Sequence, residues 1–244
     1  MHTDNIVTTD VLIIGGGPAG LATAIHLADL LNKGQVSKRI LLIEKGASIG
    51  SHILSGAIVK SCVFRELLSE KGYQNIPFDS EVKKDAVVWL GRNWKIKIPF
   101  HPPYMGNKGN KVASLGQLCR YLATVAEEKG VEIYSGFSVN ELLFENNRLS
   151  GVKTNDTGLN HEGKPMENFQ EGTTVKADLI VFAEGSRGTM TGQLKDRFQL
   201  MKDSNEQMYS LGCKELWQIP EGRICAGEVY HTMGFPLSHN EFGG

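Results

Sequence analysis

The sequence lacks several features that mark whole classes of protein. Lysine and arginine (26) do not outnumber aspartate and glutamate (27), and the formal net charge is −1. Because nucleic-acid-binding proteins normally carry a basic excess, we expect no nucleic-acid partner. No apolar run approaches the roughly 18–20 residues of a transmembrane helix, so any membrane contact is expected to be peripheral. The opening MHTDNIVTTDVLIIGGG has neither the basic start of a secretory signal peptide nor an Arg-rich transit sequence.

Cysteine is scarce and scattered. Cys62, Cys119, Cys213 and Cys225 include no CxxC pair, and none lies beside a second ligand at metal-binding spacing. This pattern predicts buried, unpaired thiols in a reducing compartment and no metal site within this chain. No nucleophile–base pairing stands out either, so we predict no catalytic side chain.

Glycine, by contrast, is abundant, with 28 residues placed mainly at turns. The strand DVLIIGG runs into a glycine turn and then into a segment, residues 18–31, whose apolar side chains recur with helical spacing at Leu21, Ala24, Ile25 and Ala28. A second short apolar run, ILLIEKG, follows. Two such runs flanking a helix predict a βαβ unit with buried parallel strands.

The rest of the chain predicts an alternation of short strands and helices. We expect a short helix in CVFRELLSEKG, a hairpin around Gly91 in AVVWLGRNWKIKIP, an ordered loop over 99–112, and a helix capped by Ser114 and ended by Gly130. Strands are expected on both sides of an Asn146-Asn147 turn and in TTVKADLIVFAEGSRG. A helix in GQLKDRF and strands such as YSLGCKELWQI complete the prediction.

The most informative motif is GxGxxG at Gly15, Gly17 and Gly20, with Pro18 and Ala19 between the last two glycines. In a dinucleotide-binding βαβ unit the first glycine permits the tight turn. The second lets a pyrophosphate approach the backbone, and the third lets helix and strand pack closely. The N-terminus of the following helix then faces the phosphates. The motif predicts a binding site for an adenine dinucleotide.

The end of the second strand and a later strand narrow the choice between FAD and NAD. Glu44, followed by Lys45, is placed to accept hydrogen bonds from an unphosphorylated ribose, although an exposed loop acid or helix cap would also explain it. FAD enzymes related to glutathione reductase and the aromatic hydroxylases return to the dinucleotide with a later strand. Here Ala183, Glu184 and Gly185 form a matching turn. We therefore predict FAD.

Other candidate contacts rest on weaker patterns. Leu115, Gly116 and Gln117 begin a helix that touches the cofactor in such flavoproteins, but they also fit a plain helix cap. Val139 sits where that fold reads the adenine edge through its backbone. His52 is placed either near the flavin or as a structural loop histidine, and His101, His231 and His239 have no assigned role.

Several segments together carry a more specific resemblance: IEKGASIGSHILSGA, SLGQLCRYLA, GVKTNDTGLNHEGKP, VFAEGSRG, LGCKELWQIP and HTMGFPL. In unbroken order over nearly the whole chain, they resemble the electron transfer flavoprotein–ubiquinone oxidoreductases. The resemblance implies an FAD enzyme that passes electrons from reduced electron transfer flavoprotein to ubiquinone at a membrane surface. Its [4Fe–4S] cluster would be held by cysteines of a C-terminal part that is absent from this sequence.

The resemblance also implies an organisation. We expect an α/β, Rossmann-like FAD-binding domain of the glutathione-reductase/hydroxylase type with an inserted β-rich, quinone-side region, truncated. Residues 1–98 would hold the first βαβ unit and hairpin, 99–188 the continuation with the returning strand, and 189–244 the start of the quinone-binding region. Gly243 and Gly244 would lie beside the quinone headgroup, unless they form only a glycine turn.

Family members are roughly twice as long, so the resemblance implies an N-terminal fragment that binds FAD weakly and reduces no quinone alone. Together with the lack of a transit peptide, it also predicts peripheral association with the cytoplasmic face of a bacterial inner membrane. Two alternatives stay open. One is a geranylgeranyl-reductase-like or hydroxylase-like FAD oxidoreductase with a nicotinamide donor and no cluster, and the other is a non-catalytic dinucleotide-binding module.

Overall fold

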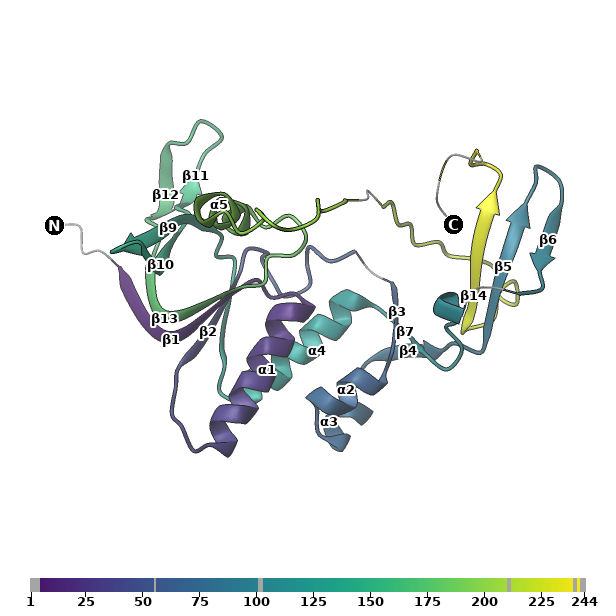
Figure 1. Ribbon diagram of the computed structural model, residues 1–244, viewed down its shortest axis with the longest axis horizontal. Helices are drawn as coiled ribbons and strands as arrows, with labels where there is room; N and C mark the ends of the chain where they lie inside the picture. The colour runs from purple at the N-terminus through teal and green to yellow at the C-terminus, as the bar shows by residue number, and fades with distance from the viewer. Residues whose placement is uncertain (1–4, 55, 101–102, 210–211, 239–240, 242–244) are drawn as a thin grey trace. The chain divides into compact units, whose positions relative to one another are not determined.

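The structure is a computed structural model that describes residues 5–54, 56–100, 103–209, 212–238 and 241 (Figure 1). The chain divides into two compact units, each built from two separate stretches. The first unit comprises Met1–Ile53 with Cys119–Gly212, and the second comprises Leu54–Leu118 with Cys213–Gly244. Each unit is described below by itself.

The first unit is built on a six-stranded sheet. Its strands are, in spatial order, β8 (Glu132–Ser135), β2 (Ile40–Glu44), β1 (Ile6–Ile14), β13 (Thr174–Phe182), β10 (Arg148–Thr154) and β9 (Val139–Glu145). The first four run parallel to one another, β10 pairs antiparallel with β13, and β9 pairs antiparallel with β10. Because the chain leaves β1 toward β2 on one side and returns through β13 on the other, β1 lies at the switch point where doubly wound sheets bind ligands.

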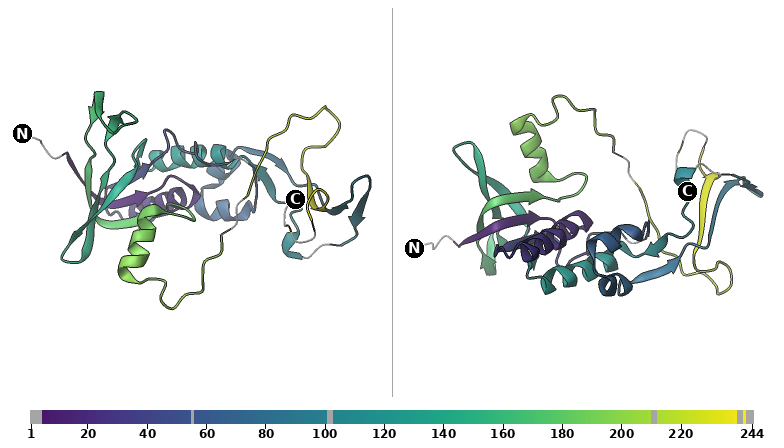
Figure 2. Two further views of the ribbon diagram at one scale, coloured as in Figure 1. Left: turned by 90° about the horizontal axis from the view of Figure 1, so that it is seen from above. Right: turned by 60° about the horizontal axis from the view of Figure 1, so that its bottom comes forward.

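Helices cover both faces of this sheet. On one face, α1 (Pro18–Lys33) lies beside α4 (Leu115–Glu128), as Figures 1 and 2 show. The predicted apolar positions of α1 are all buried, which confirms the helical pattern. On the other face, Met190 of α5 (Thr189–Phe198) is buried in a core with residues of several strands, among them Leu12, Ile43 and Val152. The second half of β1 and all of β2 before Glu44 are continuously apolar, as expected for strands covered on both faces.

Short turns fix the antiparallel edge of the first unit. Asn146 and Asn147 adopt positive φ values of 50° and 62°, the conformation of a type I′ hairpin turn between β9 and β10. A two-stranded ribbon, β11 (Thr157–Leu159) with β12 (Pro165–Gln170), follows. The asparagine pair confirms the predicted hairpin.

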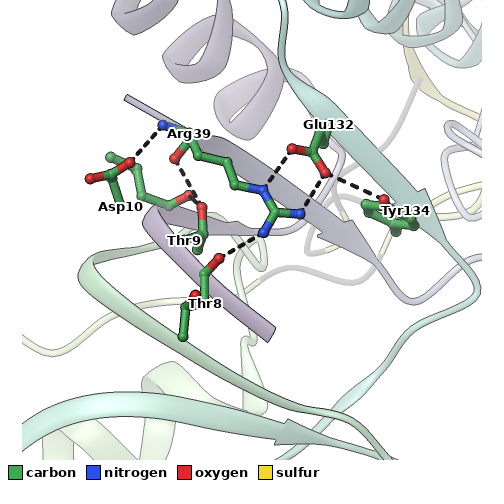
Figure 3. A network of polar contacts seen from close by, with 7 residues as sticks. Thr8, Thr9, Asp10, Arg39, Glu132 and Tyr134 are labelled. Atoms are coloured by element: carbon green, nitrogen blue, oxygen red, sulfur yellow. Dashed lines mark hydrogen bonds and ion pairs between the residues drawn. The ribbon is translucent and has the colours of Figure 1, made fainter. Parts of the chain in front are cut away.

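A network around Arg39 ties the loop before β2 to the sheet (Figure 3). The Arg39 guanidinium donates two hydrogen bonds to Glu132, at 2.7 and 2.8 Å, and one of 2.7 Å to the Thr8 carbonyl oxygen. The Arg39 backbone N–H donates to Asp10 at 2.7 Å, and the Thr9 hydroxyl donates to the Arg39 carbonyl at 2.9 Å. All of these groups lie at or near the amino ends of parallel strands, away from the ends that form the site described below.

The second unit contains two three-stranded sheets. One has the order β3 (Ala57–Val59), β7 (Lys111–Ala113) and β4 (Phe78–Glu81), and the other β14 (Glu228–Gly234), β5 (Lys84–Leu90) and β6 (Lys95–Ile98). The predicted hairpin is confirmed as β5 and β6, which pair antiparallel, whereas β14 pairs with β5 in parallel. The short helices α2 (Cys62–Leu67) and α3 (Glu70–Gln74) and the 3₁₀ turn η1 (Pro103–Met105) complete the unit.

Three predictions about local structure are wrong. Among the described residues of YSLGCKELWQI no strand forms, and Leu216 and Trp217 stay 97% and 75% exposed because no partner strand pairs with them. The single helix predicted in CVFRELLSEKG is two helices, since Leu68 is extended and the Ser69 hydroxyl caps the second. The predicted loop over 99–112 ends in strand β7.

The prediction of buried cysteines is also wrong for three of the four. Cys119, on the packed face of α4, is buried, whereas Cys62, Cys213 and Cys225 are exposed. Cys62 begins a short helix with no buried residue, and Cys213 and Cys225 lie in irregular segments. These three cysteines therefore lie outside the buried faces of the helices and sheets.

The two compact units do not coincide with the three consecutive segments predicted from the sequence. Strand pairing brings β14 next to β5 and β13 next to β1, so contacts group residues that are distant in the chain. The functional labels of residues 1–98, 99–188 and 189–244 therefore remain predictions. Within the described residues, no helix is both long and apolar enough to cross a membrane.

Candidate dinucleotide-binding site

The carboxyl ends of the parallel strands are joined by backbone hydrogen bonds that bring four loops together. Gly15 N–H donates to the Ile43 carbonyl and Ala183 N–H to the Ile14 carbonyl, both at 2.8 Å, while Phe137 N–H donates to the Glu44 carbonyl at 2.9 Å. The glycine turn after β1, the end of β2, the segment between β8 and β9 and the turn after β13 thus meet at one edge of the sheet. This is the edge at which open α/β sheets bind ligands.

The three motif glycines are each required by different geometry. Gly15 has φ +111°, and a side chain there would also clash with the Ala183 carbonyl group. A Cβ on Gly20 would clash with the Gly15 carbonyl oxygen, because helix α1 crosses β1 closely there. A Cβ on Gly17 would meet no protein atom within 4 Å. Gly17 therefore faces open space, which is the place that a pyrophosphate needs.

That open space is a cavity of about 810 Å³, within the range of small-molecule and cofactor sites. Its walls come entirely from the first unit, and many of them are backbone-rich loops. They include the predicted residues Gly15, Gly17, Pro18, Ala19, Glu44, Lys45, Val139, Ala183, Glu184 and Gly185. The structure thus brings together residues from four separate parts of the sequence.

The N-terminus of helix α1 is open toward a ligand. Gly17 is the N-cap residue, makes no side-chain cap, and is followed by Pro18 at the first position. The first turn carries no acidic side chain, although acids are favoured there by the helix dipole. The first N–H groups of a helix have no intrahelical acceptor. An anionic group such as a pyrophosphate would accept hydrogen bonds from these N–H groups and would be stabilised by the positive end of the helix dipole.

Glu44 has a role in the structure that its position in the sequence did not reveal. Its Oε2 accepts a hydrogen bond of 2.7 Å from Gly16 N–H, and its Oε1 accepts one of 2.7 Å from Gly46 N–H. One carboxylate therefore braces the glycine turn and the loop after β2. Each oxygen retains a further lone pair, so Glu44 can still accept the predicted bond from a ribose hydroxyl, which remains a prediction.

Glu184, the acid of the returning turn, caps helix α5. Its Oε2 accepts hydrogen bonds of 2.7 Å from both the backbone N–H and the hydroxyl of Thr191, and its Oε1 accepts one of 3.3 Å from Met190 N–H. The carboxylate thus holds the turn after β13 against the start of α5. This arrangement gives Glu184 a structural function beside its place in the cavity wall.

Two cationic side chains also line the cavity. Lys45 follows β2, and Arg187 follows the returning turn, where its guanidinium lies 4.6 Å from the centre of the Tyr209 ring. The two acids in the wall, Glu44 and Glu184, are already bonded to backbone N–H groups. The cavity therefore offers cationic groups to a phosphate without an unpaired carboxylate opposing them.

Some predicted residues are not brought to this cavity. Gly116 and Gln117 begin α4 in the second unit and are not among the lining residues, so their contact with a cofactor stays a prediction. His52 does line the cavity. Gly243, Gly244, His101 and His239 lie outside the described residues.

Several lining residues were not singled out from the sequence, namely Phe137, Ser138, Arg187, Gly188, Thr189 and Thr191. Phe137 and Ser138 lie directly before β9, next to the predicted Val139. The others follow the returning turn within GSRGTMTG, whose small residues and hydroxyls are typical of a helix start near a ligand. Among the described residues, no group of three or more His, Cys, Asp or Glu side chains could hold a metal ion.

Comparison with known proteins agrees with this geometry. A family model described as pyridine nucleotide-disulphide oxidoreductase matches residues 9–208, and one described as ETF-QO, ubiquinone-binding, matches residues 209–244. The electron transfer flavoprotein–ubiquinone oxidoreductase of Dictyostelium discoideum is 40% identical over 236 residues, and the probable one of Saccharomyces cerevisiae is 42% identical over 243. These matches confirm the resemblance drawn from the sequence.

The matches cover nearly all of this chain but less than half of each relative. Each alignment takes in 96% of this chain, but 39% of the Dictyostelium protein and 38% of the yeast protein. The chain thus spans about two fifths of the length of the curated relatives it matches.

Solved structures confirm the predicted fold class. A geranylgeranyl bacteriochlorophyll reductase-like protein from Thermoplasma acidophilum superposes with a TM-score of 0.51 at 23% identity, covering 73% of this chain and 39% of that one. The flavin-dependent brominase Bmp2 gives 0.51 at 18% identity, with 78% and 40% covered. At these identities the likeness concerns the fold alone. With its glycine turn, returning strand and family match over residues 9–208, the chain belongs to the pyridine nucleotide-disulphide oxidoreductase family.

Proposed function

We propose that this chain binds FAD and forms the flavin-binding part of an enzyme that passes electrons from reduced electron transfer flavoprotein to ubiquinone. The observation that carries the proposal is the cavity at Gly17, where an open helix N-terminus, a returning turn and two cationic side chains face one space. The named relatives, 37–42% identical, support the choice of electron donor and acceptor.

The residues of this chain have binding and orienting roles in that reaction. The N-terminus of α1 would hold the pyrophosphate, and Lys45 and Arg187 would balance its charge. Glu44 would keep the glycine turn in position and accept a bond from the adenosine ribose. Bound FAD would supply the two-electron redox chemistry that no side chain here provides.

The cavity has a second contact point opposite the glycine turn. The turn after β13 and the start of α5 contribute residues 182–189 and Thr191 to the wall that faces the glycine turn. A cofactor that extends past its pyrophosphate toward this turn would contact both the glycine turn and the turn after β13. The resemblance to flavoproteins predicts such a cofactor. NAD also extends past its pyrophosphate, so the choice of FAD rests on the resemblance to flavoproteins whose later strand returns to the cofactor.

The acceptor side of the proposal rests on residues 209–244, which match the ubiquinone-binding family model. A [4Fe–4S] cluster would require ligands beyond the residues described here. We further propose peripheral association with a membrane surface, where ubiquinone resides. The relatives carry "mitochondrial" in their names, whereas the sequence predicts the cytoplasmic face of a bacterial membrane, and fractionation of the source cells distinguishes the two.

FAD titration of the purified chain tests the first step. We expect the bound flavin to show a structured visible spectrum and quenched fluorescence. The variant Gly17→Val directs a side chain into the pyrophosphate space, where its Cβ meets no protein atom within 4 Å, and Gly17 has φ −81° and ψ −177°, which valine adopts. It should stay folded, with a small loss of stability because valine is a poorer N-cap residue than glycine, but bind FAD at least about tenfold more weakly, because the phosphates lose their backbone contacts.

Gly192→Ala is the matched control for this variant. It also replaces a glycine that has open space around it, but within α5 and outside the cavity wall. It should bind FAD like the wild type. Equal FAD affinity in the wild type and in Gly17→Val, or no flavin binding by the wild type, would contradict the proposed site.

A further inference from the structure

The cavity walls follow the order of the strands that carry them. In the sheet β1, β2 and β8 are neighbours, and their carboxyl ends lead to the glycine turn at Gly17, to Glu44 and to the segment 136–138. Neighbouring strands lie about 4.8 Å apart, so these three points succeed one another along the edge of the sheet. A ligand that places its pyrophosphate at Gly17 and its ribose at Glu44 would therefore reach segment 136–138 next.

Backbone hydrogen bonds fix this segment beside the end of β2. Gly136 N–H donates to the Gly46 carbonyl oxygen at 2.8 Å, and Phe137 N–H donates to the Glu44 carbonyl oxygen at 2.9 Å. Gly136 has φ +85°, so the chain turns sharply just before Phe137. Phe137 is thus anchored directly beside the backbone of the residue that is proposed to contact the ribose.

Phe137 presents an aromatic ring to the cavity. The described wall of the cavity also contains Phe182, but that residue packs against the core of the first unit. Phe137 is 38% exposed and contacts Tyr134 of β8, with the ring centres 6.2 Å apart and the ring planes at 85°. An edge contact of this kind covers at most one face of the Phe137 ring. A flat apolar surface is therefore left for a ligand.

The chemistry of this end of the cavity suits an aromatic base. The Glu44 carboxylate is already bonded to two backbone N–H groups, so it does not add an unpaired charge beside the ring. Of the parts of a dinucleotide, the base gains most from an aromatic surface, since the phosphates and the ribose are polar. Stacking on an aromatic side chain strengthens the binding of a base by about tenfold.

We propose that the adenine base of the bound dinucleotide stacks on the ring of Phe137. The pyrophosphate at Gly17, the ribose at Glu44 and the base at Phe137 then follow the order β1, β2 and β8 along the sheet edge. Val139, whose backbone was predicted to meet the edge of the base, lines the same wall. The proposal rests on the proposed function but concerns only its adenosine half, which ADP alone can probe.

The affinity for ADP tests the role of the ring. Phe137→Leu keeps an apolar side chain but removes the flat surface, so it should bind ADP about tenfold more weakly than the wild type. Phe137→Tyr keeps the ring and should bind ADP like the wild type. Titration calorimetry on the 244-residue chain measures all three affinities. Equal ADP affinity in the wild type and in Phe137→Leu overturns the proposal, as does an equal loss in both variants.

Phe169→Leu is the matched control. Phe169 is 37% exposed, close to the value for Phe137, but it lies on β12 and does not line the cavity. This variant should bind ADP like the wild type, and urea unfolding should show that both leucine variants are folded. If Phe169→Leu weakens ADP binding as much as Phe137→Leu does, the effect is not local to the cavity and the proposal is overturned.

The ring signals of Phe137 give a readout that a merely structural role would not move. In a ¹³C-phenylalanine-labelled chain, these signals are assigned by comparison with Phe137→Leu. A stacked base shields the ring protons of its partner, so ADP should move the Phe137 signals upfield and leave those of Phe169 in place. ADP binding that leaves the Phe137 signals unmoved overturns the proposal.

FAD titration of the same proteins separates this proposal from the proposed function. If ADP binds through Phe137 but FAD binds no more tightly than ADP, the proposed flavin site fails alone. If FAD binds equally to the wild type and to Phe137→Leu, the role of Phe137 fails alone. If the wild type binds neither ligand, both are overturned.

Discussion

At the scale of single residues, the sequence identified Glu44 as a candidate site residue but did not reveal which groups it contacts. Glu44 was predicted to meet a ribose, and the structure has it joining the Gly16 and Gly46 amides. A carboxylate is acceptor-only and can serve two backbone donors at once. An acid at the end of the second strand of a dinucleotide unit can therefore order the glycine turn as well as contact a ligand.

Glu44→Gln tests this double role. One amide oxygen can replace only one carboxylate oxygen, so the Gln NH₂ group would face a backbone N–H. We expect a loss of about 1–3 kcal/mol in the free energy of unfolding and about tenfold in FAD affinity. Urea unfolding and flavin fluorescence measure the two effects. Glu167→Gln, on an exposed position of β12, should change neither, and an unaltered Glu44→Gln would contradict the bracing role.

The cysteines give a second prediction at this scale. Burial raises the pKa of Cys119 to about 11, whereas Cys62, Cys213 and Cys225 are exposed. Because the thiolate is the reactive form, Cys119 should resist an aromatic disulfide reagent at pH 8 while the other three react. Counting released thiolate before and after adding denaturant measures this. Rapid modification of all four cysteines in the folded chain would show that α4 opens readily.

At the scale of elements, the turn after β13 and helix α5 are joined by one side chain. Glu184 accepts bonds from the Met190 and Thr191 amides at the start of α5, where the positive end of the helix dipole also favours a carboxylate. Gly188, the formal N-cap residue, supplies no side-chain cap. The stability of α5 and the shape of the cavity wall therefore depend on the same carboxylate.

Glu184→Ala should lower the free energy of unfolding by about 1–2 kcal/mol, since helix N-terminal N–H groups lose their acceptor. FAD affinity should fall with it, because the returning turn is no longer held to α5. Glu127→Gln, on the exposed side of α4, is the control. Helix content followed by circular dichroism during urea unfolding measures the change. A variant as stable as the wild type would mean that water replaces the carboxylate at no cost.

At the scale of the whole molecule, ion pairs make stability depend on pH in the acid range. Hydrogen bonding to Arg39 lowers the pKa of Glu132, and bonding to Lys38 lowers that of Asp10. The pKa values of Glu81, Glu145 and Glu228 are lowered by Lys111, Lys176 and Lys84 in the same way. A carboxylate with a depressed folded-state pKa contributes stability above its unfolded value and loses it as pH falls through the folded value.

The free energy of unfolding should therefore be steady near neutral pH and decline as pH falls below about 4.5, the ordinary pKa of a glutamate. Glu132→Gln should reduce stability at pH 7 and flatten this decline. The pair is more than one third exposed on each side, so the loss should be no more than about 1 kcal/mol. Urea unfolding at several pH values measures it. A parallel offset between the two proteins at every pH would contradict an ionic origin.

The local elements of this chain follow from its sequence for reasons of backbone chemistry. The βαβ unit was predictable because buried parallel strands are continuously apolar and a covering helix repeats every three to four residues. The Asn146-Asn147 turn was predictable because asparagine tolerates positive φ. The three motif glycines were predictable because their spacing reflects three different close approaches.

Tertiary structure alone decided the contacts between distant segments. Glu184 meets α5, and Asp85 meets His231, because strand pairing brings those segments into register, and no local pattern encodes that pairing. The exposure of Trp217 and of three cysteines was missed for the same reason, since burial depends on which strand or helix covers a residue. The sequence determined where the glycine turn forms, and the pairing of distant strands determined which side chains surround the cavity beside it.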